Sequence, residues 1–349
     1  MANRYWIGAN TNWDDTSNWS ATSGGSGGET VPTSVDDVYF DVNSFGTTTT
    51  VSLVVGAGSA ICKDFIWDGF AQTPTFTAGY GDSLEVYGSF QLASNMTWNA
   101  SSSSLYFKGV STHTITTQDK TLNATVYFQG TGTYTVQDKL GMSYYPQRTL
   151  KFYSGTLDLN EKILDVGGVT FYGSDAKTFK MNGATISFHG STCTWDETSG
   201  SNITFEANEF TNVEASNSTG SSVTVNWKGN GNTFGGSLNV KNTTKDETFK
   251  IYGNNTFHTI NIQGDIADAG VTKTLQLEAG YTQNVTSFYA KGTSADYVNI
   301  SSLTSGSQGY LSKTFGSSVC DYISLKDCGG RGGAIWWAGI NSQDLGNNA

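Results

Sequence analysis

Short segments in which apolar and polar residues alternate recur along the chain, and most of them end on a glycine. In such a segment every second side chain points to the same face, which is the pattern of a half-buried β-strand. The clearest copies are LEVYG (84–88), LYFKG (105–109), VYFQG (126–130), VTFYG (169–173), ISFHG (186–190), VNWKG (225–229) and FKIYG (249–253). With looser copies at 150–155, 203–207 and 275–280, their closing positions fall 17 to 27 residues apart. This interval suits one turn of a β-solenoid.

A second family of alternating segments follows most of these copies at a short offset. Its members have the form Ser or Thr, apolar, any, apolar: SFQL (89–92), TYTV (133–136), TLDL (156–159), TFKM (178–181), SLNV (237–240), TINI (259–262) and SFYA (287–290). Two strands in phase within each period favour stacked parallel coils. An antiparallel sandwich would instead show turn signals about every 8 to 12 residues.

The residues two positions before the closing glycine share one face and are large and apolar. They are Val86, Phe107, Phe128, Phe171, Phe188, Trp227 and Ile251. Because stacked coils repeat about every 4.8 Å, these side chains would form a ladder inside the coil. We interpret the ladder as core rather than as a cofactor site. A single coil cannot bury its apolar face alone, so the stack needs a cap at each end.

The composition agrees with a strand-rich fold, since the chain has 42 Gly, only 3 Pro and 13 % aromatic residues. No run has the spacing of an amphipathic helix. The formal net charge of −11 repels phosphate backbones and anionic lipid, so we expect no nucleic-acid partner.

The cysteines and aspartates give no clear metal site. Cys62, Cys193, Cys320 and Cys328 contain no C-x-x-C pair and have no histidine at ligand spacing. We interpret them as isolated thiols, with a Cys320–Cys328 pair left open. The aspartates Asp14, Asp15, Asp36, Asp37 and Asp41 lack the spacing of a calcium loop, and we interpret them as turn and cap residues. We therefore expect no metal and no cofactor.

Tryptophan motifs mark both ends of the chain. The first reads W-x-G, W, N-W at Trp6, Gly8, Trp13, Asn18 and Trp19, followed by Pro32 and by D-D-x-x-F at Asp36, Asp37 and Phe40. The closing segment, 319–348, contains Trp336 and Trp337. Both ends resemble phage tail or virion and bacterial surface β-solenoid proteins.

The resemblance implies an all-β fold, a right-handed parallel β-helix of about ten coils with Trp-rich caps at both ends. We expect the N-terminal cap and first strands at residues 1–50, the coils at 51–300 and the C-terminal cap at 301–349. The resemblance also implies an appendage, an adhesin or a tail protein. Phage members are often homotrimers, so we expect a homo-oligomer of this kind.

The start of the chain lacks the basic, apolar and small-residue regions of a secretory signal, and no later run is long and apolar enough to span a bilayer. We therefore expect no membrane insertion. We also expect synthesis in the host cytoplasm without a signal peptide, followed by an extracellular place on a virion. A bacterial surface adhesin whose signal or anchor was cut away is the alternative.

The outward-facing stripe of the coils gives little support for catalysis. Cleaving a glycoside needs two carboxylates about 5 to 10 Å apart, and the stripe has no carboxylates on adjacent coils. His189 and Glu206, one coil apart in the repeat, are the pair best suited to acid–base work. We interpret them as a solvated polar contact, so no catalytic residue is predicted.

Tyrosines recur on this stripe, and we predict that they form a contact surface. They are Tyr87, Tyr106, Tyr127, Tyr172 and Tyr252. Flat amphipathic rings suit both sugars and subunit interfaces. The sequence thus favours a non-enzymatic virion protein, in a tail fibre, spike or head decoration, that contacts host surface glycans or other virion proteins. A polysaccharide depolymerase on the same scaffold is the alternative.

Overall fold

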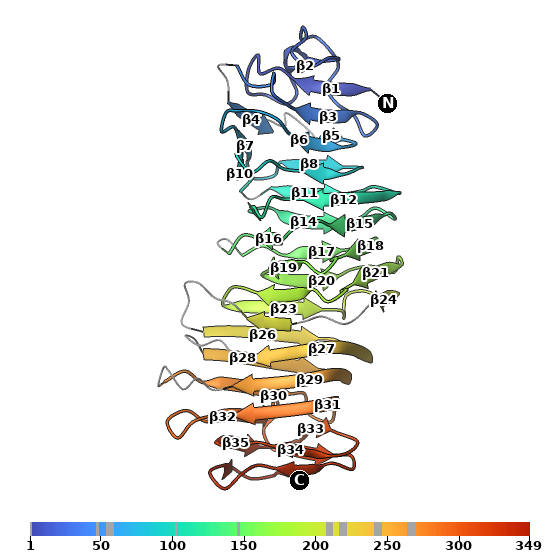
Figure 1. Ribbon diagram of the computed structural model, residues 1–349. Coiled ribbons are helices and arrows are strands. Elements are labelled where there is room, and N and C mark those ends of the chain that lie inside the picture. The colour runs from blue at the N-terminus through green and yellow to red at the C-terminus, as the bar shows by residue number, and fades with distance from the viewer. Residues whose placement is uncertain are drawn as a thin grey trace. The chain divides into compact units, whose positions relative to one another are not determined.

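The computed structural model describes residues 2–46, 49–53, 59–101, 103–144, 147–206, 212–215, 222–240, 246–263 and 270–349 (Figure 1). It is nearly all β, with about 1 % of residues in helix, and its parallel coils stack into a β-solenoid of about ten turns. The predicted fold class is therefore confirmed.

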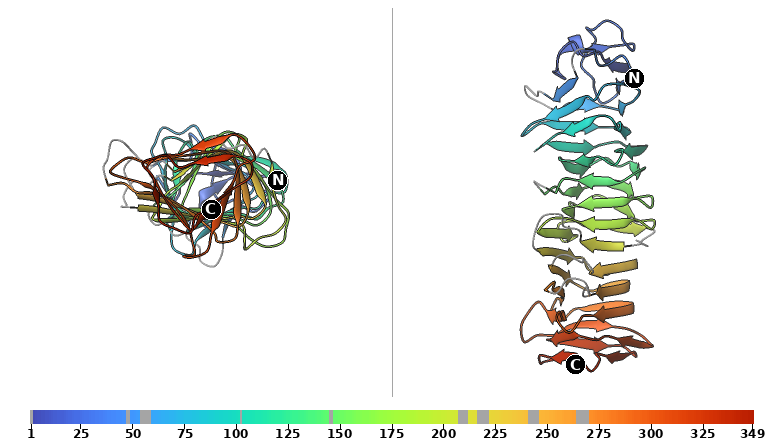
Figure 2. Two further views of the ribbon diagram at one scale, coloured as in Figure 1. Left: turned by 90° about the horizontal axis from the view of Figure 1, so that it is seen from below. Right: turned by 60° about the vertical axis from the view of Figure 1, so that its left-hand side comes forward.

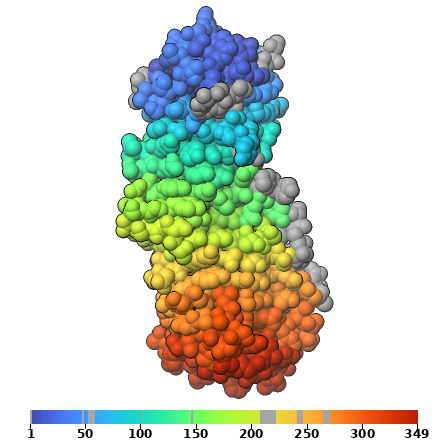
Figure 3. Space-filling model, turned by 180° about the vertical axis from the view of Figure 1, so that it is seen from behind, coloured from blue at the N-terminus to red at the C-terminus, as the bar shows by residue number. Residues whose placement is uncertain are grey.

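The chain divides into two compact units. Unit 1 comprises Met1–Val166, Tyr172–Lys180 and Gly200–Thr204, and unit 2 comprises Gly167–Phe171, Met181–Ser199 and Phe205–Ala349. Within each unit the surface follows the order of the chain, from blue to green in unit 1 and from yellow to red in unit 2 (Figure 3). This is the expected behaviour of a solenoid, in which each coil contacts its neighbours in the sequence.

The strands of unit 1 form three sides of the coils, and the third side is divided between two sheets (Figure 2). All the pairs are parallel except one at the N-terminal end. The first side, here called the tyrosine sheet, contains β5 (Ala60–Cys62), β8 (Ser83–Val86), β11 (Ser104–Phe107), β14 (Thr125–Phe128) and β17 (Leu150–Phe152). The second contains β2 (Trp19–Ser20), β1 (Asn3–Trp6), β3 (Asp37–Phe40), β6 (Phe65–Trp67), β9 (Phe90–Gln91), β12 (Thr112–Thr116), β15 (Thr133–Val136), β18 (Gly155–Asp158) and β21 (Lys177–Lys180). The third side is formed by β4 (Thr50–Leu53), β7 (Thr75–Ala78) and β10 (Thr97–Asn99), and then by β13 (Thr121–Leu122), β16 (Leu140–Met142) and β19 (Ile163–Val166). A short 3₁₀ helix, η1 (Thr16–Asn18), precedes β2.

Unit 2 has longer strands in two main parallel sheets. One contains β20 (Gly168–Phe171), β23 (Thr192–Asp196), β26 (Ser222–Lys228), β28 (Asp246–Tyr252), β30 (Lys273–Leu277), β32 (Val298–Ser302), β35 (Ile323–Lys326) and β38 (Gln343–Asp344). The other contains β22 (Thr185–Phe188), β25 (Asn212–Ala215), β27 (Asn232–Val240), β29 (Asn255–Gln263), β31 (Thr282–Lys291), β33 (Gly309–Ser312) and β36 (Cys328–Arg331). A two-stranded sheet of β34 (Ser317–Val319) and β37 (Ile335–Trp337) lies near the C-terminus, and β24 (Ile203–Glu206) crosses the division between the units.

The repeat read from the sequence mixed strands from different sides of the coil. ISFHG corresponds to β22 and ITFEA to β24, whereas the strand that pairs with VTFYG (β20) in unit 2 is β23, with Val169 opposite Trp195. The register expected for these two copies is therefore wrong. Alternation identifies a strand but not its side of the coil, because every side buries one face in the same core.

The predicted core ladder is buried. Its seven members expose at most 1 % of their surface. Phe107 and Phe128 occupy the same register on β11 and β14, and their rings stack with centroids 5.0 Å apart. In unit 2, Trp195 and Trp227 stack in the same way at 4.7 Å. Parallel in-register pairing thus converts a sequence repeat into stacked side chains.

The N-terminal tryptophans form a buried cap. Trp6, Trp13 and Trp19 expose 1 % of their surface or less, and Trp19 contacts the rings of Trp6 and Trp13 edge-on at 5.2 and 4.8 Å. The Trp19 Nε1–H donates to the carbonyl of Trp13 at 2.7 Å. Strand β2 pairs antiparallel with β1 and so covers the end of the second sheet of unit 1. A very short edge strand, here of two residues, discourages end-to-end pairing with another chain.

Candidate functional site

The five predicted contact tyrosines fall into both units. Tyr106 lies on β11, Tyr127 on β14, and Tyr87 directly after β8; with Tyr172 they belong to unit 1. Tyr252 ends β28 in unit 2, opposite Lys228 in the register. All five side chains are half-buried.

Four tyrosines of unit 1 stack into one row, here called the tyrosine ladder: Tyr106, Tyr127, Tyr153 and Tyr172. Tyr106 and Tyr127 are in register and stack at 4.5 Å between ring centroids. The next contacts measure 6.4 Å between Tyr127 and Tyr153 and 5.0 Å between Tyr153 and Tyr172. The structure therefore brings together three of the predicted residues and adds Tyr153.

The sequence pattern contains a signal for Tyr153. Tyr153 follows the core residue Phe152, just as Tyr172 follows Phe171 and Tyr87 follows Val86. It lies in the looser copy LKFYSG (150–155), where an extra residue separates the tyrosine from the closing glycine. Aligning the copies on the buried residue rather than on the glycine would have included it.

Two lysines lie over the ladder. The Nζ of Lys151 is 5.1 Å from the ring centroid of Tyr127, 5.9 Å from that of Tyr172 and 3.4 Å from the Tyr127 hydroxyl. The Nζ of Lys108 is 5.3 Å from the ring of Tyr106 and forms an ion pair with Glu85 at 2.7 Å. Such cation–π contacts hold both the charge and the rings in place.

Tyr87 lies beside the ladder and contacts Glu85, which forms an ion pair with Lys108. Its hydroxyl donates to Glu85 Oε2 at 3.2 Å. Burial, with a contribution from Glu85, raises the pKa of Tyr87. Tyr87 is thus tied to the ladder through Glu85 and Lys108 rather than through ring stacking.

The charge state of the ladder follows from its partial burial. Burial raises the pKa of Tyr153, so this phenol stays protonated at neutral pH. Burial lowers the pKa of Lys151, but the surrounding tyrosine hydroxyls outweigh this effect and the net pKa is raised. Tyr153 therefore presents a neutral phenol, and Lys151 presents a cation beside it.

The surface of the ladder consists of groups that can form hydrogen bonds. A stacked ring covers the face of its neighbour, so the surface of the ladder consists of ring edges and hydroxyls, each able to donate and accept hydrogen bonds. Its neighbouring carboxylate, Glu85, is held by Lys108 and Tyr87. Such a row fits a polyhydroxylated chain that lies along it.

The predicted pairing of His189 with Glu206 is corrected by the structure. His189 is buried directly after β22, whereas Glu206 is exposed at the end of β24, in a different sheet. Strand β22 instead pairs with β25. The two residues therefore do not occupy neighbouring positions on one stripe.

A carboxyl that the sequence pattern did not single out lies in unit 2. Glu197 accepts hydrogen bonds from Trp195 Nε1 and Asn232 Nδ2. Burial raises its pKa to about 7, against the effect of these hydrogen bonds. Asn232 begins a row with Asn255 and Gln283 in the same register on β27, β29 and β31, and Asn255 Nδ2 donates to Gln283 Oε1 at 3.1 Å. We interpret this row as a polar corner of the coil that Glu197 completes.

The cysteines and aspartates have structural roles. All four cysteines are free and buried, so Cys320 and Cys328 are not paired. Asp15 accepts from the backbone and hydroxyl of Ser17 and caps η1, and Asp36 accepts from Thr33 and from the backbone of Ala2. Within the described ranges there is no group of three or more His, Cys, Asp or Glu residues that could hold a metal ion.

Comparison with known proteins found no matching family model, curated protein or solved structure. In the part of the chain that the structure describes, no helix is long and apolar enough to cross a membrane.

Proposed function

We propose that the protein is a non-enzymatic surface component of a phage virion whose tyrosine ladder binds a host surface glycan. The observation that carries the proposal is the row of four stacked tyrosines with Lys151 over it. The motifs at Trp6–Trp19 and 319–348, which resemble phage and bacterial surface solenoids, support the virion setting. A bacterial surface adhesin would use the same ladder in the same way.

A linear glycan is the ligand that this geometry fits best. Neighbouring rings of the ladder lie 4.5 to 6.4 Å apart between centroids, so an extended chain can contact several of them at once. Phenol hydroxyls can both donate hydrogen bonds to sugar hydroxyls and accept hydrogen bonds from them. Lys151 adds affinity for acidic sugars, which is strongest at low salt.

The proposal also includes the assembly of several copies of the protein on one particle. Tail fibres, spikes and head decorations are repeated on a particle, so weak contacts through one ladder add up through several copies. A homotrimer would present three ladders, and other virion proteins would hold it on the particle. These partners rest on the resemblance of the ends.

The test is to incubate the protein with host capsular or surface polysaccharide and to follow both binding and cleavage. Saturable retention of the polysaccharide without new reducing ends or unsaturated products is the expected result. Release of oligosaccharide would contradict a non-enzymatic role and favour a depolymerase. Absence of binding to any host polysaccharide or host cell would remove the glycan proposal.

A further inference from the structure

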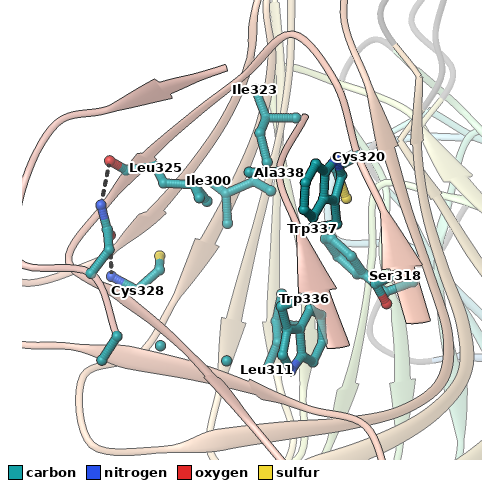
Figure 4. Close-up of a pocket in the computed structure, with 15 residues that line it drawn as sticks. Ile300, Leu311, Ser318, Cys320, Ile323, Leu325, Cys328, Trp336, Trp337 and Ala338 are labelled. Carbon is teal, nitrogen blue, oxygen red and sulfur yellow. Dashed lines mark hydrogen bonds between the residues drawn. The ribbon is translucent and has the colours of Figure 1, made fainter. Parts of the chain in front are cut away.

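An apolar pocket and the tyrosine ladder differ in the charge that they present to a ligand. The pocket, of about 390 Å³, lies in unit 2 near the C-terminus, and its lining includes Ile300, Leu311 and Trp336 (Figure 4). None of the lining side chains is charged. This pocket cannot distinguish acidic from neutral glycans by charge, whereas the ladder, with lysines over its rings, can.

The row of half-buried side chains that contains Tyr106 and Tyr127 has opposite charges at its two ends. Tyr106 pairs in register with Glu85 on β8 and with Tyr127 on β14. Tyr127 in turn pairs with Lys151 on β17. Four neighbouring parallel strands thus place a carboxylate, two phenols and an ammonium group in one row. The two ends are three strand spacings apart, roughly 14 Å.

The carboxylate end of this row is neutralised within the protein. Lys108 lies two residues after Tyr106 and reaches back to Glu85, with its Nζ 2.7 Å from Oε1. The Glu85 side chain exposes 14 % of its surface and the Lys108 side chain 26 %, so solvent screens the pair only in part. The Tyr87 hydroxyl donates to Oε2 of Glu85 at 3.2 Å. Glu85 therefore cancels the charge of Lys108 before a ligand arrives.

The ammonium end of the row has no corresponding carboxylate. Among the residues that the structure describes, no Asp or Glu forms an ion pair with Lys151. Its Nζ lies 3.4 Å from the Tyr127 hydroxyl and over the rings of Tyr127 and Tyr172. Contacts with ring faces hold a cation in place without cancelling its charge. Lys151 is therefore able to attract an anionic group of a ligand.

We propose that Glu85 is a specificity-determining residue of the tyrosine ladder, because by neutralising Lys108 it leaves Lys151 as the position where the ladder attracts an anion. The ligand is then a mostly neutral glycan with widely spaced acidic sugars rather than a polyacid. The formal net charge of −11 acts in the same direction, since it repels a polyacid as a whole. The role of Glu85 rests on the proposed function and narrows the class of glycan that the ladder binds.

Two probes with the same backbone separate charge density from chain shape. One is polygalacturonate, which carries a carboxylate on every sugar, and the other is the same polymer with most carboxylates converted to methyl esters. The wild-type full chain should bind the ester at least as tightly as polygalacturonate. Glu85→Gln, which uncovers Lys108, should bind polygalacturonate about three-fold tighter than the wild type at low salt and bind the ester equally. The gain should vanish at high salt, where such a charge is screened.

Two further variants locate the effect. Adding Lys108→Met to Glu85→Gln should abolish the gain, because the uncovered lysine is then removed. Asp165→Asn removes the carboxylate that pairs with Lys139 on another side of unit 1, and it should behave like the wild type. Its net charge equals that of Glu85→Gln, so it controls for the total charge of the protein. Urea unfolding checks that every variant is folded.

The role of Glu85 is wrong if the wild type prefers polygalacturonate, if Glu85→Gln leaves binding unchanged, or if the gain also appears in Asp165→Asn or survives Lys108→Met. Failure of a wild type that binds the host polysaccharide to bind either probe would also overturn this role, while the proposed function would stand. Absence of binding to the host polysaccharide as well would remove the proposed function itself.

Discussion

Tyr106 and Tyr127 stack at 4.5 Å because they occupy the same register on the neighbouring parallel strands β11 and β14. The core pair Phe107 and Phe128, next to them in the sequence, stacks in the same way on the opposite face of these strands. One pair stabilises the interior and the other forms the surface. The period-2 geometry of a strand thus places a core and a candidate binding site on consecutive residues.

The buried N-terminal cap predicts that Trp13→Ala unfolds the first coils before it affects binding. Trp13 contacts Trp19, Phe40 and Phe65, and truncating a buried tryptophan costs about 3–5 kcal/mol. Urea unfolding followed by tryptophan fluorescence measures the loss. The control is Tyr80→Ala, because Tyr80 is 94 % exposed and should change stability by less than about 0.5 kcal/mol. Equal stability of the two variants would contradict the cap.

Close approach of neighbouring coils predicts that Gly130→Ala is poorly tolerated. A Cβ atom there would lie 2.1 Å from the carbonyl oxygen of Gly109 on the preceding coil, so the backbones would have to separate. We expect a loss of roughly 2–4 kcal/mol in the free energy of unfolding. Gly46 has no atom within 4 Å of the corresponding position, and Gly46→Ala should be neutral. A neutral Gly130→Ala would show that the coils are not packed this closely.

Glu197 predicts that unit 2 becomes less stable as the pH rises towards neutrality. Burial raises the pKa of Glu197 from 4.5 to about 7, so folding takes up a proton between these values. Its stabilising effect is complete below about pH 4.5 and is lost as the pH rises through about 7, a change of roughly 3 kcal/mol. Urea unfolding between pH 4.5 and 8 measures it.

Glu197→Gln should remove this pH dependence, since an amide resembles the protonated carboxyl. The matched control is Glu206→Gln, which changes an exposed carboxylate and should retain the pH dependence. A pH profile of stability that is unchanged by Glu197→Gln would contradict the role given to Glu197.

Asp36 affects stability in a different pH range. Hydrogen bonds from Thr33 and Ala2 lower its pKa against the opposing effect of burial. Protonation of Asp36 therefore makes the folded state less stable only as the pH falls below about 4.

The charge of Lys151 over two tyrosine rings predicts that the affinity for an acidic glycan depends on the salt concentration. Lys151→Met keeps most of the apolar stem and removes the charge over Tyr127 and Tyr172. We expect a loss of stability of about 0.5–1 kcal/mol and weaker binding of acidic polysaccharide at low salt, with the difference vanishing at high salt. Lys162→Met, a similar change on another turn of unit 1, should leave binding unchanged. A loss of binding in Lys151→Met that is the same at low and high salt would show that the charge of Lys151 does not contribute to the affinity.

The sequence predicted the all-β solenoid, its buried ladder and most of the tyrosine surface, because alternation and repetition are local properties of the chain. It misplaced ISFHG and ITFEA because the three sides of a coil share one alternation pattern. It missed Glu197, whose pKa is raised by burial, because that burial depends on how the strands carrying Trp195 and Asn232 pack around it.

The central claim is that the tyrosine ladder is the binding surface, and the most direct measurement compares two double variants. Tyr106→Ala with Tyr127→Ala removes two rungs of the ladder. Tyr5→Ala with Tyr39→Ala removes a half-buried stacked pair at 5.0 Å on another sheet of unit 1. Binding of host surface polysaccharide should fall at least about ten-fold in the ladder variant and stay within about two-fold in the control. Equal binding by the wild type and the ladder variant, with both folded, would contradict the account.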